Sequence, residues 1–361
     1  MKTGLSLQEL ARKIEENSTK KRDFVAATDT MKMEPIGDKL ALVLNETHEL
    51  GVNELAHNQI ATHAGIPADY YRRMREHSPA LLTSNVNHWL HAEPARRLVR
   101  TMDGTARAFL SDSYRPLENE ELAEAILPIL LDMRLEVMSC DITERRLYIK
   151  AVDERIVRDV PSGRKIGDGS HVFFDTCSPA LIVSNSEVGA GALSVETGVF
   201  TKVCTNLAAI AKDGMKRRHV GARHELTDNL QHLLSDDTKR ATDKAIWLQV
   251  RDVVKGAFDE ARFAARCQQM GALTEIPLNG EKAVEVVNFT RKKFGLTEGE
   301  GNSILRHLIE GGDLTGYGLF NAVTRSAQDH ESYDRASELE VLGGKLIELP
   351  KSQWQELARA A

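Results

Sequence analysis

The sequence predicts an α+β protein, with a central antiparallel β-meander sheet packed by helices and a helical C-terminal region. Two segments, LEVMSCDI and RRLYIKAV over residues 135–152, alternate apolar and polar residues at the period of a strand. Three further segments, ALIVS, GALSV and VFTKV over residues 180–203, predict a meander with turns at Ser186–Gly191 and Thr197–Gly198. Apolar residues then recur at helical spacing from Ile246 to Ala265, which predicts a long helical region.

Length and composition bound the organisation. A chain of 361 residues corresponds to roughly two domains or slightly more. We divide it into a mixed N-terminal region (1–95), a strand-rich core domain (96–224) and a helical C-terminal region (225–361). The net charge of −6 excludes a uniformly basic nucleic-acid coat, although it allows a local basic patch on an acidic body.

Several absences favour a cytoplasmic protein. The chain has no run of 18 apolar residues, so we expect no membrane span. Its first residues form an amphipathic helix rather than a signal peptide. The four cysteines are scattered along the chain, which suggests a reducing compartment.

Local signals place elements in the N-terminal region. Ser6 and Glu9 form the pattern of a capping box, which predicts that a helix starts there. The run LALVL at 40–44 is a candidate strand. Residues 54–76 are typical of a helix, a turn at Gly65 and a second helix.

Further signals lie in and beside the strand-rich core. Arg107 to Leu110 is a candidate strand, and Asn119 is expected to cap a helix that Pro128 should kink or end early. The segment VPSGRKIGDGSH predicts a loop or hairpin tip. Asn206 is expected to cap a helix over LAAIAKDG.

The motifs of well-known catalytic sites are missing. The chain has no phosphate-binding G-x-x-x-x-G-K-[ST] loop, no H-E-x-x-H and no G-x-S-x-G. His219 and His224 have a spacing that suits a metal, but no cysteine or carboxylate cluster completes the set. We therefore expect no cofactor and no metal.

A cluster of cations after the meander is the strongest functional signal. Five basic residues lie within twelve positions, against one acid, Asp213: Lys212, Lys216, Arg217, Arg218 and Arg223. Such a density would neutralise several phosphates of a nucleic acid. The alternative interpretation is a solvated connection between a helix and a loop.

A sheet face adds to this signal. In the strand RRLYIKAV, the side chains of Arg146, Tyr148 and Lys150 project to the same face. Proteins commonly bind single-stranded nucleic acid through cations and an aromatic ring on one sheet face. We therefore expect Tyr148 to stack on a base, with Arg146 and Lys150 beside it.

Four motifs resemble those of a phage/plasmid-like protein family, a group of unknown function found on prophages and plasmids. They are Asp103–Gly104, Tyr114 to Asn119, Asn185 to Gly189 and Val203 to Asn206, within residues 95–225. Leu207 departs from the Gly or Thr that often follows in that family. The resemblance implies a mobile-element context and no established reaction. A β-meander followed by a long helix is also similar to the cores of phage single-strand annealing recombinases, at the level of fold alone.

These observations favour a non-enzymatic nucleic-acid-binding protein of phage or plasmid DNA metabolism. Single-stranded DNA is the expected partner, annealing or recombination the expected role, and a homo-oligomer the expected state. One alternative is a protein-binding module that engages or inhibits a host factor, which the net acidity favours. Another is an enzyme of unrecognised type with a site near Asn185, Ser186 and Asn206.

Overall fold

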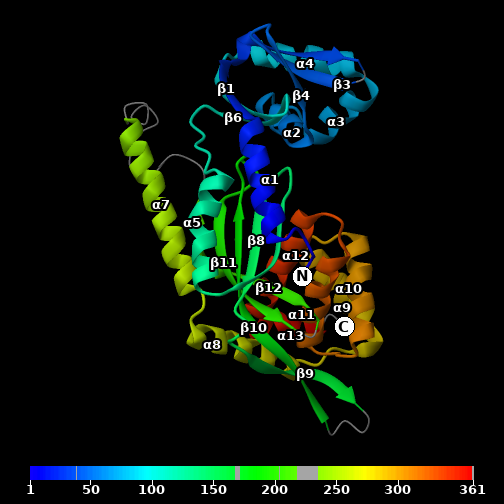
Figure 1. Cartoon of the computed structure of the whole chain (residues 1–361). Helices are drawn as coiled ribbons and strands as arrows, with labels where there is room; N and C mark the ends of the chain where they lie inside the picture. The colour runs from blue at the N-terminus through cyan, green and yellow to red at the C-terminus, as the bar shows by residue number, and fades with distance from the viewer. Residues whose placement is uncertain (38, 167–170, 203, 218–234, 360–361) are drawn as a thin grey trace.

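Two sheets, each flanked by helices, organise the computed structural model of this chain (Figure 1). The structure describes residues 1–37, 39–166, 171–202, 204–217 and 235–359. Both sheets are mainly antiparallel, and the C-terminal region is helical, so the predicted α+β class is confirmed. Within the described ranges, every helix is too short or too polar to cross a membrane.

The first sheet has the strand order β1-β5-β6-β4-β3-β2. Its strands are β1 (Lys21–Ala27), β2 (Met31–Ile36), β3 (Lys39–Leu44), β4 (His48–Val52), β5 (Arg96–Met102) and β6 (Thr105–Ser111). Three helices cover one face: α2 (Glu54–His63), α3 (Ala68–His77) and α4 (Pro79–Ala92). The predicted helix, turn and helix are therefore confirmed, with Gly65 at a positive φ of 66° in the turn.

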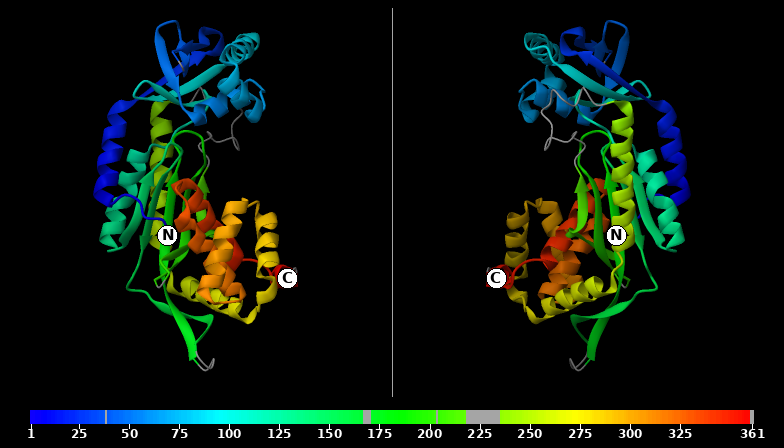
Figure 2. Two further views of the ribbon diagram at one scale, coloured as in Figure 1. Left: turned by 90° about the vertical axis from the view of Figure 1, so that its right-hand side faces the viewer. Right: turned by 90° about the vertical axis from the view of Figure 1, so that its left-hand side faces the viewer.

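The second sheet has the order β12-β11-β10-β8-β7, and β9 pairs with the outer part of β10. Its strands are β7 (Glu136–Ile142), β8 (Leu147–Val152), β9 (Arg158–Ile166), β10 (His171–Asn185), β11 (Leu193–Thr201) and β12 (Asn206–Arg217). Helices cover both faces of this sheet, as Figure 2 shows. Almost every side chain of its central strands is consequently buried.

One face of the second sheet packs on α1 (Leu7–Lys20), α5 (Asn119–Asp132) and α7 (Asp236–Gly256). Ser6 and Glu9 form the predicted capping box at the start of α1. Although α1 precedes the first sheet in the chain, its Leu10 and Ile14 belong to the core of the second sheet. The helix then leads directly into β1, so it connects the two sheets (Figure 1).

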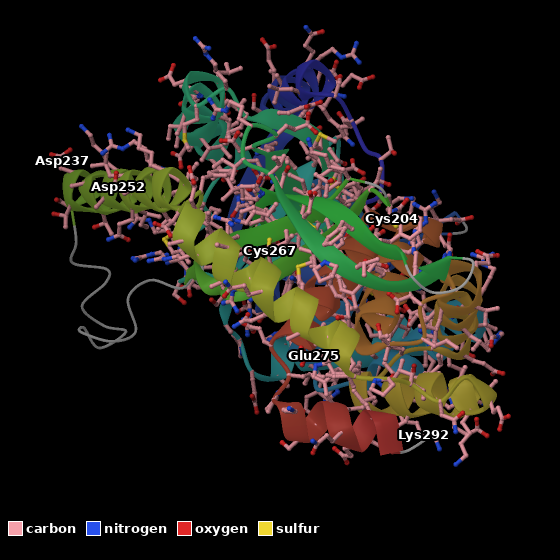
Figure 3. All side chains as sticks on the ribbon, turned by 90° about the horizontal axis from the view of Figure 1, so that it is seen from below. Cys204, Asp237, Asp252, Cys267, Glu275 and Lys292 are labelled. Atoms are coloured by element: carbon pink, nitrogen blue, oxygen red, sulfur yellow. The ribbon has the colours of Figure 1, made fainter. Side chains whose placement is uncertain are left out.

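The C-terminal helices are α8 (Glu260–Ala272), α9 (Ala283–Phe294), α10 (Glu298–Gly311), α11 (Gly316–Ser326), α12 (Tyr333–Ile347) and α13 (Lys351–Arg359). Helix α12 contacts β12 on the opposite face, α11 contacts β9 and β12, and α8 contacts β9, whereas α9, α10 and α13 pack mainly on other helices. Four short 3₁₀ turns span Thr28–Thr30, Leu273–Glu275, Gly280–Lys282 and Ala327–Asp329. Seen from below, α8 with Cys267 crosses beneath the strands, and α7 with Asp237 and Asp252 extends away from them (Figure 3).

Two expectations about residues of β11 and β12 were wrong. The turn expected at Thr197–Gly198 is instead the interior of β11, whose register with β12 shifts between Val195 and Thr197. Gly198 serves close strand packing there, because a Cβ would lie 2.7 Å from the Ala208 carbonyl oxygen. The segment after Asn206 was expected to be a helix but is the strand β12. Its residues Leu207 to Ile210 are buried on both faces of the sheet. They therefore form an unbroken apolar run without the alternation that marks a strand with one exposed face.

The start and the end of helix α5 also differ from the expectation. It begins at Asn119, after Glu118 in the cap position, and it does not end early at Pro128 but continues to Asp132. The long helical region predicted from Ile246 to Ala265 is confirmed as two helices, α7 and α8, and Asp259 caps the second. The strands β5 and β6 also join the first sheet, so the change from one sheet to the other falls after residue 111 rather than at residue 95.

Candidate nucleic-acid interface

The predicted base-stacking face is buried. Tyr148 is 5% exposed and its Oη donates to Asp334 Oδ1 at 2.9 Å. Lys150 is fully buried, with Nζ 2.6 Å from Glu340 Oε2. Both carboxylates belong to α12, which covers this face of β8. The expectation that Tyr148 stacks on a base beside Lys150 is therefore wrong.

The surroundings of Tyr148 and Lys150 are those of a polar core. Lys150 Nζ lies 4.3 Å from the ring centroid of Tyr333, within the range of a cation–π contact. Burial raises the pKa of the Tyr148 and Tyr333 hydroxyls, so both stay protonated. These side chains attach α12 to the sheet and are unavailable to a ligand.

Arg146 has a different position at the start of β8. It is half-buried, and its Nη2 donates to the Ala190 carbonyl oxygen at 3.0 Å. Its guanidinium lies directly over Gly191, where a Cβ would come within 1.6 Å of Nη2. The absence of a side chain at residue 191 thus allows Arg146 to lie against the β10–β11 turn.

Lys216 and Arg217 lie at the same end of the sheet. Lys216 pairs in register with Ser194, and Arg217 with Leu193, at the start of β11. Leu147, next to Arg146, pairs with Asn185 at the end of β10. Lys216 is exposed, and its Nζ lies 3.1 Å from Glu196 Oε1. The fold thus brings three of the predicted cations to one sheet end.

The other predicted cations cannot be placed. Lys212 belongs to β12, but its side chain lies outside the described residues. Arg218 and Arg223 fall in the segment 218–234, which is also outside them, as do His219 and His224. Among the described residues, no group of three His, Cys, Asp or Glu side chains could hold a metal ion.

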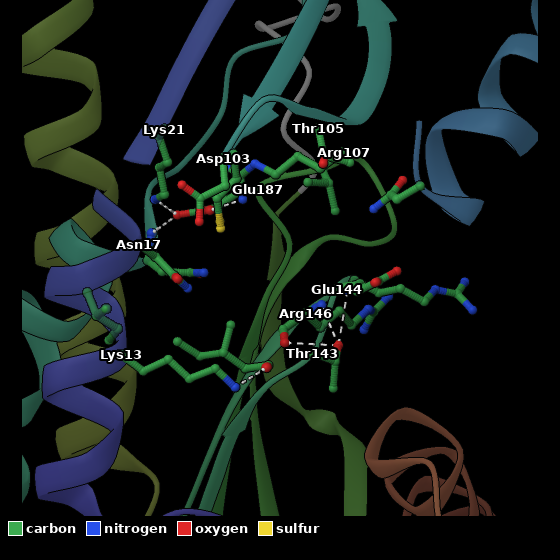
Figure 4. Close-up of a pocket in the computed structure, with 17 residues that line it drawn as sticks. Lys13, Asn17, Lys21, Asp103, Thr105, Arg107, Thr143, Glu144, Arg146 and Glu187 are labelled. Atoms are coloured by element: carbon green, nitrogen blue, oxygen red, sulfur yellow. Dashed lines mark hydrogen bonds and ion pairs between the residues drawn. The ribbon is translucent and has the colours of Figure 1, made fainter. Parts of the chain in front are cut away.

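Two cavities adjoin at Arg146. The first, the α12 cavity, has a volume of about 460 Å³ and is lined by Arg146, Lys216 and residues of α12. The second, the junction cavity, has a volume of about 420 Å³ and lies between α1, the first sheet and the β7–β8 turn (Figure 4). Its basic lining residues are Lys13, Lys21, Arg107, Arg145 and Arg146.

Lys13, Lys21, Arg107 and Arg145 are the residues that sequence reasoning missed. Lys13 and Lys21 come from the consecutive elements α1 and β1, whereas Arg107 and Arg145 come from β6 and the β7–β8 turn, much later in the chain. Two signals were present in the sequence: Lys13 and Asn17 are four residues apart on one face of a helix, and Arg145 and Arg146 are adjacent. We define the basic end as these four residues together with Arg146, Lys216 and Arg217.

Glu187 organises the charges at the base of the junction cavity. It is 3% exposed, and its carboxylate lies 2.5 Å from Lys21 Nζ and 2.8 Å from Arg107 Nη1. The backbone N–H of Asn119 also donates to it, at 2.8 Å. Burial by itself raises the pKa of Glu187, but the charges of Lys21 and Arg107 outweigh that effect and lower it to about 2. Glu187 is therefore a fixed anion at neutral pH.

Two of the four motifs meet beside Glu187. Asn185 Nδ2 donates to the Leu117 carbonyl oxygen at 2.7 Å and to Asn119 Oδ1 at 2.9 Å. Tyr114 Oη donates to the Ser186 carbonyl oxygen at 3.1 Å and accepts from the Gly189 N–H at 3.1 Å. These contacts connect the loop before α5 to the β10–β11 turn.

The structure does not bring Asn185 and Asn206 together. In β11, the partner of Asn206 is Thr201, whereas Ser184 beside Asn185 pairs with Ser194. Those two β11 residues are seven positions apart, or roughly 23 Å along a strand. Asn185 and Ser186 are also fully buried. An active site shared by Asn185 and Asn206 is therefore ruled out by their separation.

Comparison of the chain with protein-family models, curated proteins and solved structures gives no match. The resemblance to a phage/plasmid-like family accordingly remains a prediction.

Proposed function

We propose that this protein binds single-stranded nucleic acid without catalysing a reaction, and that the phosphate backbone follows the basic end. The observation that carries the proposal is that two cavities, with basic residues from α1, both sheets and the β7–β8 turn, adjoin at Arg146. A role in phage or plasmid DNA metabolism, with annealing as its activity, is part of the same proposal and is supported by sequence resemblance alone.

The charges support a phosphate ligand. Arg145 is exposed, and no described residue forms an ion pair with its guanidinium. Lys216 is exposed with one carboxylate partner, Glu196, so it retains donors for a phosphate. Contacts of this kind release counterions from the nucleic acid, which makes binding strong at low salt and weak at high salt.

The burial of Tyr148 changes the kind of recognition that we propose. Without that ring, the described part of the basic end offers cations but no exposed aromatic platform. Base stacking contributes affinity to many single-strand binders. We therefore expect binding that depends on phosphate contacts and is insensitive to base sequence.

Oligonucleotide binding tests the proposal. A labelled oligo-dT is titrated with protein at two salt concentrations, and the variant Arg145→Ala/Arg146→Ala is compared with wild type. For single strands, each lost phosphate contact makes the slope of log K against log salt less steep by about 0.7. With one contact for each arginine, the double variant should reduce the steepness by about 1.4. Failure of the wild-type protein to bind oligo-dT at low salt would contradict the proposal.

A matched control removes the same charge elsewhere. Lys282 and Lys351 are exposed residues on the C-terminal helical side, outside both cavities. The variant Lys282→Ala/Lys351→Ala should retain the wild-type affinity and salt slope. Equal weakening by both double variants would show that net charge, rather than the basic end, determines binding.

The proposed annealing role also includes self-association. Val172, Phe173 and Phe174 are 61%, 37% and 54% exposed on β10, beyond its pairing with β8. Consecutive exposed apolar residues on a projecting strand suit contact with a second copy of the chain. Sedimentation velocity should show a species larger than the 40.1 kDa chain, and Phe174→Ser should reduce it. A monomer at micromolar concentration would contradict the annealing role.

A further inference from the structure

The junction cavity has the dimensions and the position of a small-ligand site. Its volume of about 420 Å³ lies within the range of about 300–1,000 Å³ that is common for such sites. It lies between α1 and strands of both sheets, so its walls are set by regular elements rather than by loops alone (Figure 4).

The lining carries an excess of positive charge. Five cations face three carboxylates, which are Asp103, Glu144 and Glu187. Glu187 is already bound by Lys21 and Arg107, and Asp103 lies 3.3 Å from Lys20 Nζ. An anion is therefore favoured in this cavity over a cation.

Arg107 has hydrogen-bond donors to spare. Its Nη1 donates to Glu187 Oε2 at 2.8 Å, but Nε and Nη2 are buried and have no partner among the described residues. The side chain as a whole is only 11% exposed. Buried guanidinium donors without a partner are costly, and an anion with several acceptor oxygens would satisfy them.

Neutral donors line the same cavity. Asn17, half-buried on α1, and Thr105 on β6 both lie in its wall, and neither side chain forms a hydrogen bond with another described residue. Lys13, one turn before Asn17, already donates to the Ile142 carbonyl oxygen at 2.8 Å. A ligand with a compact group of acceptor oxygens would thus meet a guanidinium, an amide and a hydroxyl.

We propose that the junction cavity binds a phosphate monoester. A monoester carries a charge of about −1.5 to −2 and three acceptor oxygens, which match the excess charge and the free donors. Two sources share this chemistry: the terminal phosphate of a nucleic-acid strand and a free mononucleotide. The first source rests on the proposed function, because the strand would reach the cavity along the basic end.

Matched oligonucleotides separate the two sources. One sequence is prepared with a 5′-phosphate, with a 3′-phosphate and with hydroxyls at both ends, and each affinity is measured by fluorescence anisotropy. Adenosine monophosphate is titrated separately by calorimetry. One charge-assisted contact corresponds to about tenfold in affinity, so one phosphorylated form should bind about tenfold more tightly than the hydroxyl form.

Two variants assign the effect to the cavity. Arg107→Lys keeps the charge beside Glu187 but removes the donors at Nε and Nη2, and Asn17→Ala removes a neutral donor without a structural partner. Both should lose the preference for phosphate, which is the ratio of two affinities measured on the same variant. Asn17→Ala, which keeps every cation of the basic end, should still bind the hydroxyl oligonucleotide with wild-type affinity. Asn302→Ala, at an exposed site on α10, is the control and should retain the preference.

The outcomes distinguish this inference from the proposed function. Equal affinity for all three oligonucleotides, together with no heat from adenosine monophosphate, would overturn the inference and leave the proposed function standing. Binding of adenosine monophosphate that Arg107→Lys abolishes, with no oligonucleotide binding at all, would support the inference and overturn the proposed function.

Discussion

Lys150 and Glu340 form an ion pair that is sealed between β8 and α12. Both side chains are 1% exposed, and Nζ lies 2.6 Å from Oε2. Removing water from two charges costs several kcal/mol for each ion, and their attraction offsets that cost only while both are present. The pair therefore fixes the position of α12 on the sheet, and its net contribution to stability is small.

Substitution of one partner should be far worse than substitution of both. We expect Lys150→Met to lower the free energy of unfolding by about 3–5 kcal/mol, because Glu340 stays buried without its partner. The double variant Lys150→Met/Glu340→Leu should recover most of this loss. Urea unfolding measures both values. A double variant as unstable as the single one would contradict this account of the pair.

The same variants examine the function of Lys150. Because its ammonium group lies under α12, the double variant should bind oligo-dT with wild-type affinity. A large loss of affinity in a folded double variant would return Lys150 to the nucleic-acid interface.

Two glycines of α12 allow close packing, Gly344 against β12 and Gly343 against α11. A Cβ at Gly344 would lie 1.8 Å from the Ala209 carbonyl oxygen, and one at Gly343 would lie 2.2 Å from Thr324 Cγ2. The first obstacle is backbone, which cannot move aside without shifting the strand. Glycine at residue 344 therefore sets the distance between the helix and the sheet.

We expect Gly344→Ala to lower the free energy of unfolding by about 1–3 kcal/mol, the usual cost of overpacking a core. Gly299→Ala on α10 is the control, because nothing lies within 4 Å of its Cβ. That change should be neutral or stabilise the protein by up to about 1 kcal/mol. Thermal or urea unfolding of the two variants compares them. Equal effects would mean that the close contact is unimportant.

Short-range patterns predicted α1 and β8 correctly. Ser6 and Glu9 predicted the start of α1, and the alternation in RRLYIKAV correctly assigned Tyr148 and Lys150 to one face of β8. The alternation carries no information about what covers that face. We expected Tyr148 to face solvent, but α12 covers it. That helix comes nearly two hundred residues later in the chain, so a local pattern cannot show where it packs.

Strand β12 was harder to predict. Leu207 to Ile210 in β12 form a continuous apolar run, which looks the same in a buried strand and in a helix. The junction cavity could not be predicted for a related reason. Its Lys13, Arg107 and Arg145 become neighbours only when α1 docks on the second sheet and β6 joins the first.

At the scale of the whole molecule, a buried network of charges connects the two sheets. Arg100 of β5 is 2% exposed; it pairs with Asp23 and Glu118, and its Nη1 donates to the Glu187 carbonyl oxygen at 2.8 Å. Lys21 of β1 joins Glu118 and Glu187. Since Glu187 belongs to the β10–β11 turn, this network couples the core of the first sheet to that of the second.

Acid should weaken this coupling in a defined pH range. Glu187 has a folded pKa of about 2 against an ordinary value of 4.5, so its stabilising effect is complete above about pH 4.5 and is lost as the pH falls towards 2. Burial and the charge of Glu187 raise the pKa of Glu118. Keeping Glu118 ionised therefore costs stability, and this cost disappears when acid protonates it. The two carboxylates thus oppose each other, and a variant is needed to separate them.

Glu187→Gln isolates the contribution of Glu187. At pH 7 the variant should be less stable than wild type by a few kcal/mol, because Lys21 and Arg107 lose their buried partner. Urea unfolding from pH 7 to pH 3 should show that this difference shrinks below about pH 4.5, because Glu187 then binds a proton in the unfolded chain while it stays ionised in the folded protein. Glu144→Gln, an exposed carboxylate in the same cavity lining, should match wild type throughout. A difference that stays constant across the whole pH range would mean that the ionised carboxylate of Glu187 does not connect the two sheets.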